Sequence, residues 1–239
     1  MSYKRITTKA GNVTDVVVCH DAKHNSPKRP RSKNRKKTTE TQKKHNDRRS
    51  RKSLYLLICA NYKADDLYLT LTYGGEAPPP EKAKEHIDKF LRALRRLHHK
   101  HGVPLKYIIT TEMNRIHHHM LINNIGLSIT QIKKLWDKHG FSKIQLFGGE
   151  PEDCKRLANY MEKDLKKQPK NHKRNWNCSQ NLIHPKPIKI IVPASTWREP
   201  IKPPKGYYLD KDSVMRGETE AGYPYLHYQL IKLLEEDST

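Results

Sequence analysis

Three consecutive histidines, His117, His118 and His119, open an apolar run that continues through Ile122. A run of β-prone residues predicts a strand, along which side chains alternate between two faces. His117 and His119 would then share one face, and His118 would lie on the other. Two imidazoles one residue apart on a strand can present nitrogens to a single metal ion. The same strand could instead form a basic surface that attracts phosphate, or a core that tolerates histidine.

A second group with useful chemistry is Tyr160, which falls in a helix predicted from Pro151 to Lys167. Apolar residues recur at helical spacing along this segment, and Tyr160 lies at the border of that face. Arg156, Lys163 and Lys167 lie further round on the same side. Cations beside a phenol favour its ionised form, so the oxygen could act as a nucleophile towards a phosphate. Alternatively, Tyr160 covers the core with its hydroxyl in water.

The surrounding pattern predicts the elements that would position these groups. The second strand of the sheet and the histidine strand are separated by a very short turn, which predicts an antiparallel hairpin. The order of elements is β-α-β-β-α-β-α, an α+β fold with a central antiparallel sheet and flanking helices. Leu54–Tyr62 also looks β-rich. The other predicted elements are strands at Leu67–Tyr73, Leu105–Glu112 and Lys143–Phe147, and helices at Glu81–His101, Ile129–Lys138 and Pro151–Lys167.

Taken together, these motifs resemble those of the HUH endonuclease superfamily. The strand LTLTY, the pattern R-x-H-x-H from Arg115 to His119, and Tyr-x-x-Lys from Tyr160 to Lys163 follow one another in the expected order. The chain is most similar to single-tyrosine rolling-circle replication initiators (Rep) of bacterial plasmids, phages and mobile elements. Single-tyrosine transposases share this order, so they stay open as an alternative. The resemblance implies an HUH/RRM-like fold over roughly residues 67–181.

By this resemblance, His117 and His119 bind Mg²⁺ or Mn²⁺. His118 occupies the position between them that is usually apolar, and this departure leaves the choice of ligands less certain. Relatives add a third polar ligand, for which Glu112 is the candidate. If Glu112 pairs opposite His117 across the hairpin, its carboxylate shares the histidine face, whereas a slip of one residue would send it to the other.

The resemblance also implies the chemistry. Tyr160 attacks one phosphate of single-stranded DNA at an origin hairpin, leaving a 5′-phosphotyrosine and a free 3′-hydroxyl, and a later 3′-hydroxyl rejoins the strand. Lys163 steadies the phosphate or the phenolate. Arg115, Arg156 and Lys167 could hold flanking phosphates, or they could be solvated surface charges. A host polymerase would extend the 3′-hydroxyl, and helicase activity would come from a host protein, because no Walker-type G-x-x-x-x-G-K-[ST] segment is present.

The balance of charge also points to a polyanionic partner. The chain of 239 residues carries a formal net charge of +22, which favours binding to nucleic acid. A non-catalytic, basic nucleic-acid-binding protein would share that charge and remains a second hypothesis. Residues 23–53 hold fourteen Lys and Arg against two acidic residues, a net charge of +12. We therefore predict a disordered basic arm over residues 1–53, a nuclease domain over 54–183 and a Pro/Tyr-rich extension over 184–239.

The expected compartment is the cytoplasm. The four cysteines are scattered and form no C-x-x-C pair, which favours reduced thiols over a disulfide framework or a zinc site. No apolar run approaches the ~18 residues that cross a bilayer, and the N-terminus lacks the pattern of a signal peptide. These features predict a soluble protein without a membrane partner.

Overall fold

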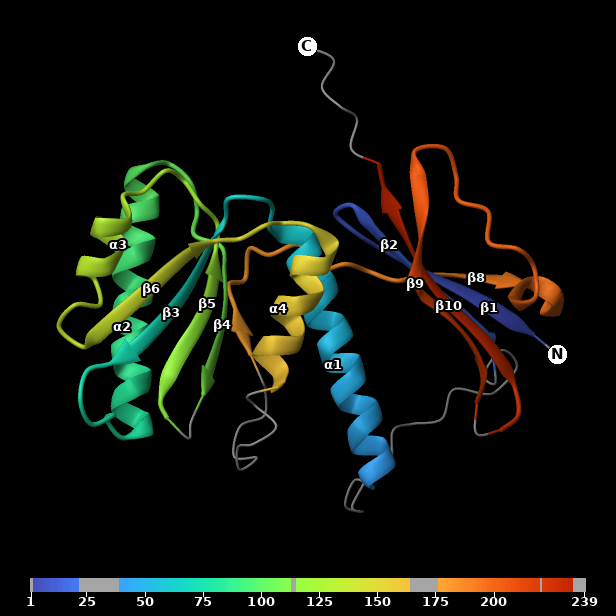
Figure 1. Cartoon of the computed structure of the whole chain (residues 1–239), viewed down its shortest axis with the longest axis horizontal. Coiled ribbons are helices and arrows are strands. Elements are labelled where there is room, and N and C mark those ends of the chain that lie inside the picture. The colour runs from blue at the N-terminus through green and yellow to red at the C-terminus, as the bar shows by residue number, and fades with distance from the viewer. Residues whose placement is uncertain (1, 22–38, 113–114, 164–175, 220, 234–239) are drawn as a thin grey trace, which may run out of the picture. The chain divides into compact units, whose positions relative to one another are not determined.

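The structure is a computed structural model in which the chain forms two compact units (Figure 1). The central unit is continuous and comprises residues 61–183. The composite unit combines residues 1–60 with residues 184–239. Residues at both ends of the chain therefore build one unit, and the middle of the chain builds the other. The structure describes residues 2–21, 39–112, 115–163, 176–219 and 221–233.

A five-stranded antiparallel sheet forms the middle of the central unit, with strand order β6-β3-β5-β4-β7. Helices α2 and α3 cover one face of this sheet, and α4 lies on the other (Figure 1). The predicted α+β fold with a central antiparallel sheet is confirmed. The elements are β3 (Leu67–Tyr73), α2 (Pro80–Lys100), β4 (Tyr107–Glu112), β5 (His117–Ile122), α3 (Ile129–Lys134), β6 (Gly140–Leu146), α4 (Pro151–Lys163) and β7 (Asn177–Cys178).

The alternation along β3 explains how this sheet gains two different faces. Its three leucines, at positions 67, 69 and 71, are at most 3% exposed and pack against Phe90 and Leu94 of α2 and against Trp136. Burying a leucine side chain completely contributes about 1.5–3 kcal/mol. The intervening residues Tyr68 and Thr70 therefore face the opposite side of the sheet. That side is the one on which His119 and α4 lie.

The composite unit contains a second five-stranded sheet, with strand order β8-β1-β2-β10-β9. The N-terminal hairpin of β1 and β2 lies between C-terminal strands, because β1 pairs with β8 and β2 pairs with β10. Among the described residues, no helix of the protein has the length and apolar character needed to cross a bilayer. The elements are β1 (Tyr3–Ala10), β2 (Val13–His20), α1 (Glu40–Asn61), β8 (Ile188–Val192), a 3-10 turn (Ala194–Trp197), β9 (Tyr207–Glu218) and β10 (Pro224–Lys232).

A buried charge network joins α1 to this second sheet. The Asp15 carboxylate of β2 is almost fully buried and lies 2.5 Å from Lys52 Nζ of α1 and 2.8 Å from His227 Nε2 of β10. The Gln229 side chain donates to Asp15 and accepts from the Tyr55 hydroxyl of α1. Burial alone would raise the pKa of Asp15, but His227 and Lys52 outweigh it and hold that pKa below its usual value.

The predicted division of the chain differs from this arrangement. The disordered arm expected over residues 1–53 is wrong for Tyr3–Ala10, Val13–His20 and the part of α1 that begins at Glu40, while residues 22–38 lie outside the described residues. Residues 184–239 are no extension of a nuclease domain, because their strands share a sheet with β1 and β2. The C-terminal partners of β1 and β2 lie about 180 or more residues away along the chain, so local composition could not reveal them.

Leu54–Tyr62 was expected to be β-rich, but most of it forms the last turns of helix α1. Its run of apolar residues is compatible with either a buried strand or a buried helix. The preceding Lys- and Arg-rich residues from Glu40 onward have good helix propensity and extend the helix back to a length of 22 residues. That length decides in favour of the helix.

Candidate functional site

The hairpin of β4 and β5 brings Glu112, His117 and His119 together. Glu112 pairs directly opposite His117 in the antiparallel register, so the two side chains share one face. His119 lies two residues further along β5 and points the same way. One ligand atom from each of the three residues lies within 4.8 Å of the others. The structure therefore places all three sequence-predicted metal ligands in one cluster.

The chemistry of this cluster fits a divalent cation. A carboxylate and two imidazoles form a donor set that suits Mn²⁺, and the carboxylate is the ligand that Mg²⁺ favours. Mg²⁺ holds its ligands at about 2.0–2.1 Å, so ligands on opposite sides of the ion lie roughly 4 Å apart. The observed separations come close to this and would need only a small contraction. Glu112, His117 and His119 therefore form a candidate metal site.

Hydrogen bonds to the Nδ1 atoms set the orientation of the two histidine rings. His117 Nδ1 lies 2.5 Å from the carbonyl oxygen of Arg115, which accepts a hydrogen bond and so requires a proton on Nδ1. The Nε2 atom of His117 lies 3.0 Å from Glu112 Oε2. In the neutral ring Nε2 is then the atom with the lone pair, on the side where the carboxylate lies.

His119 is held in a similar way by residues of β3. Its Nδ1 atom lies 2.8 Å from the Tyr68 hydroxyl and 3.4 Å from Thr70 Oγ1. The ring is only 3% exposed. A proton on Nδ1 donated to Tyr68 would leave the lone pair on Nε2, which points into the cluster. Tyr68 and Thr70 thus act as partners that orient a candidate ligand.

His118 lies on the opposite face of β5, as the alternation predicts, and is 1% exposed. Thr111 Oγ1 lies 2.9 Å from His118 Nδ1, and the Tyr73 hydroxyl lies 3.3 Å from its Nε2. Burial, aided by the charges of neighbouring histidines, lowers the pKa of His118 to about 3. This ring is therefore neutral at physiological pH and separated by the sheet from the other two histidines.

Helix α4 brings Tyr160 to the same face of the sheet as the cluster. Its apolar residues Cys154, Leu157, Ala158 and Met161 are buried, which fixes which side of the helix meets the sheet. Tyr160 lies at the border of that side and is 45% exposed. Its hydroxyl lies 3.4 Å from His119 Nε2. The candidate nucleophile and a candidate metal ligand therefore meet, although 41 residues separate them in the chain.

The remaining predicted site residues have less definite positions. Arg115 is exposed, and its backbone carbonyl rather than its side chain contacts His117. Arg156 is a largely exposed surface residue whose NH2 atom lies 3.4 Å from Asp153 Oδ1. Lys163 is the final residue of α4, but its side chain lies outside the described part of the structure, as does Lys167 entirely.

Sequence reasoning missed the role of β3 and β6 on this face. Tyr68 and Thr70 could have been suspected, because they alternate with the leucines of β3 and so face away from the core. Phe141 of β6 pairs opposite Thr72, which also pairs opposite His117, so Phe141 shares the face of the cluster. It lies two strand spacings, roughly 10 Å, from His117. Its side chain is 75% exposed.

Comparison with known proteins gives a family match over the segment that contains this site. Residues 66–168 match the model of a family described as Replication-associated protein ORF2. This segment is Rep-like. The Rep-like segment begins at β3 and contains the three candidate metal ligands and Tyr160, so the resemblance to Rep proteins is confirmed there. The composite unit lies outside the match.

A solved structure is also similar, the crystal structure of the hypothetical protein ORF119 from Sulfolobus islandicus rod-shaped virus 1. The two chains share 18% sequence identity with a TM-score of 0.35, and the similarity covers 51% of this chain and 97% of that one. A search of curated proteins found no match.

Proposed function

We propose that the central unit is a metal-dependent DNA endonuclease and strand transferase that starts rolling-circle replication. The contact between Tyr160 and His119 carries this proposal, because it sets a phenolic oxygen 3.4 Å from one of three groups suited to a divalent cation. The match of residues 66–168 to a replication-associated family supports it further. The excess of positive charge suits a nucleic-acid substrate.

In the proposed reaction, the oxygen of Tyr160 forms a bond to the phosphorus of one phosphodiester. The bond from that phosphorus to the 3′-oxygen breaks, and the 3′-oxygen keeps the electron pair and takes up a proton. The products are a 5′-phosphotyrosine and a free 3′-hydroxyl. Because the phosphodiester is exchanged for another ester of similar energy, an incoming 3′-hydroxyl can reverse the step and rejoin the strand.

Glu112, His117 and His119 would hold Mg²⁺ or Mn²⁺. When bound, such an ion neutralises charge on the non-bridging oxygens of a phosphate. The protein's own contribution is to orient both histidine rings through Arg115, Tyr68 and Thr70, and to present Tyr160 beside them. Lys163 would steady the phosphate or the phenolate, and Arg156 and Lys167 would contact flanking phosphates.

The substrate in this proposal is single-stranded DNA, supplied by an origin hairpin or a melted segment. The exposed ring of Phe141 and the exposed Lys143 lie on the same face as the cluster and would offer a base-stacking surface with a cation beside it. A host polymerase would extend the 3′-hydroxyl, and a host helicase would separate the strands.

The decisive variant is Tyr160→Phe, which removes only the hydroxyl. Cleavage of labelled single-stranded origin DNA in Mn²⁺ should fall by at least roughly 10³-fold, because no other group takes over the nucleophile's role. DNA affinity should stay the same. Tyr208→Phe is the matched control, since Tyr208 is similarly exposed but belongs to the composite unit. Undiminished cleavage by Tyr160→Phe would refute the proposal, as would wild-type protein that binds DNA but never cleaves it.

A further inference from the structure

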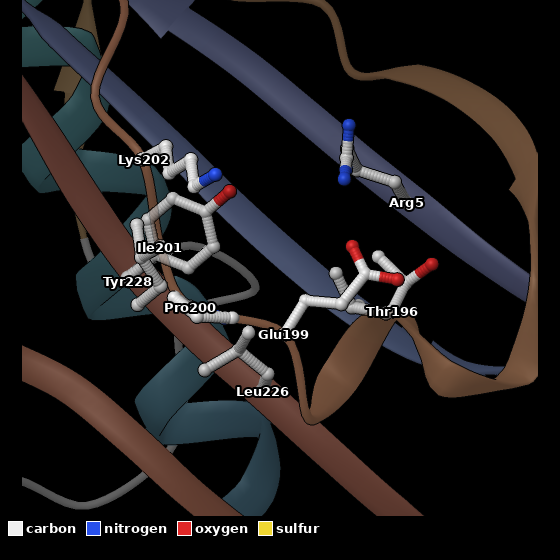
Figure 2. A pocket seen from close by; sticks show the side chains of 9 residues that line it. Arg5, Thr196, Glu199, Pro200, Ile201, Lys202, Leu226 and Tyr228 are labelled. Atoms are coloured by element: carbon white, nitrogen blue, oxygen red, sulfur yellow. The ribbon is translucent and has the colours of Figure 1, made fainter.

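The composite unit contains a pocket that the proposed nuclease chemistry does not use. It lies between one face of the second sheet and the segment that follows β8 (Figure 2), and its volume is about 360 Å³. Arg5 of β1 pairs opposite Val18 of β2, which pairs opposite Leu226 of β10. Arg5, Val18, Leu226 and, two residues further on, Tyr228 therefore share the face that forms one side of the pocket.

The pocket combines an apolar floor with an ordered wall. Val18 and Leu226 are 1% and 2% exposed and belong to a small apolar cluster that also includes Ile201. The wall is held to the sheet by Arg216 of β9, whose guanidinium donates to the backbone carbonyls of Trp197 and Glu199. The floor and the wall are thus fixed relative to each other, which favours a preformed site.

Two cations in this pocket lack an anionic partner. Within the described parts of the chain, no ion pair joins Arg5 or Lys202 to a carboxylate, and the buried Nε atom of Arg5 has no hydrogen-bond partner. Leaving such a donor unpaired costs free energy, so an acceptor supplied by a ligand would be favourable. Burial raises the pKa of Tyr228, an effect that the Arg5 charge partly offsets, and its hydroxyl remains a donor at neutral pH.

The pocket also offers an acceptor. Figure 2 shows the carboxylate of Glu199 and the hydroxyl of Thr196 on one side, and the Lys202 ammonium beside the Tyr228 hydroxyl on the other. Glu199 accepts a hydrogen bond from Ser195 at 3.4 Å, which leaves other acceptor positions of its carboxylate open to a ligand. A ligand suited to these groups carries an anion, a flat apolar body and an amino group.

We propose that this pocket binds one nucleotide of a single-stranded nucleic acid. Arg5 and Lys202 would contact the phosphate, since a guanidinium and an ammonium suit phosphate oxygens. The base would lie on the floor of Val18 and Leu226, with an exocyclic amino group donating to Glu199. The pocket volume falls at the lower end of the range of small-ligand sites, which suits a single nucleotide. The composite unit thereby becomes a second nucleic-acid-binding site, separate from the cleavage site.

Binding of fluorescein-labelled single-stranded DNA to the full-length protein, followed by fluorescence anisotropy over a range of salt, tests the phosphate contacts. Lys202→Gln and Arg5→Gln should each weaken binding by roughly tenfold and lower the slope of log K against log salt by about 0.7. Lys189→Gln is the matched control, because this exposed lysine of β8 lies on the opposite face of the same sheet. If Arg5→Gln unfolds the unit, the exposed Lys202 decides alone. Equal losses in Lys202→Gln and Lys189→Gln would overturn the proposal.

The base contact is tested with dCMP and dTMP as competitors of the labelled strand, because only dCMP carries an exocyclic amino group. Wild type should prefer dCMP, and Glu199→Gln should lose most of that preference. Equal binding of the two nucleotides by wild type would overturn the assignment of Glu199. If dCMP binds in the pocket and single-stranded DNA does not compete with it, the site takes free nucleotides and the proposed nucleic-acid role is wrong. These measurements read binding, so their outcome is independent of whether Tyr160 cleaves DNA.

Discussion

Single residues around the candidate metal site show how neutral hydrogen bonds prepare charged chemistry. The carbonyl of Arg115 and the hydroxyl of Tyr68 each meet the Nδ1 atom of one histidine. Both contacts leave Nε2 as the atom that can bind a cation. The arrangement depends on the backbone as much as on side chains, so Arg115 contributes through an atom that any residue at this position would supply.

Glu112→Gln tests the candidate metal site directly. The amide keeps the shape of the side chain but loses its charge, so the affinity for Mn²⁺ should fall at least about tenfold. Isothermal titration calorimetry or the paramagnetic signal of free Mn²⁺ would measure this change. Glu85→Gln, at an exposed position of α2, should leave the affinity as it is. Equal Mn²⁺ affinity in Glu112→Gln and wild type would exclude Glu112 as a ligand.

Phe141→Ala tests the proposed path of the DNA strand. Loss of one aromatic stacking partner costs about 1–3 kcal/mol per base, so single-stranded DNA should bind roughly 5- to 100-fold more weakly. Phe141→Trp should restore binding, because it keeps a flat ring. Leu146→Ala removes another exposed apolar side chain of β6, on the other face of the strand, and should have little effect. If both alanine variants bind equally well, the strand does not cross this part of the sheet.

At the scale of elements, the hairpin of β4 and β5 was predictable because it is local. A very short turn between two β-prone runs fixes an antiparallel pair, and the observed pairing of Glu112 with His117 follows from it. The alternation of leucines in β3 and the helical spacing in α2 were visible in the same way. Helix α1 was not, since its apolar end reads equally well as a strand and its partner strands are assembled from distant parts of the chain.

The network around Asp15 predicts how α1 depends on the sheet. Asp15→Asn would leave the buried positions of Lys52 and His227 without their carboxylate, and should lower the free energy of unfolding by roughly 1–3 kcal/mol. Thermal or urea unfolding, followed by circular dichroism, measures this loss. Asp212→Asn, on an exposed part of β9, is the control and should change little.

The same network gives stability a definite dependence on pH. The folded-state pKa of Asp15 lies below its unfolded value, so its stabilisation is fully present above the unfolded pKa and is lost as pH falls through the folded pKa. Wild type should therefore lose more stability than Asp15→Asn between about pH 5 and strongly acidic pH. Parallel pH profiles for the two proteins would show that Asp15 makes no such contribution.

For the whole molecule, net charge is the property that composition predicted and that the fold reorganises. The basic segment expected to be one arm is divided, because residues from Glu40 onward form α1 whereas residues 22–38 lie outside the described residues. Deleting residues 1–53 would remove both strands of the N-terminal hairpin and most of α1. Such a deletion would therefore disrupt the composite unit rather than remove an accessory arm.

Charge substitution in residues 22–38 separates these effects. Replacing the eight Lys and Arg of this stretch by Gln should weaken DNA binding. The slope of log K against log salt should fall by about 0.7 for each phosphate that the protein no longer neutralises. The rate of cleavage at saturating DNA should stay unchanged, because no group of the candidate site is altered. Loss of cleavage at saturating DNA would assign this stretch a role in the reaction itself.

The central claim concerns one oxygen atom, and mass spectrometry can locate it. After incubation with single-stranded origin DNA and Mn²⁺, followed by nuclease and trypsin digestion, the peptide Leu157–Lys163 should carry a covalently attached 5′-nucleotide at Tyr160. This modified peptide should be absent from Tyr160→Phe. Cleaved DNA with no modified peptide, or with the nucleotide on another residue, would contradict the account.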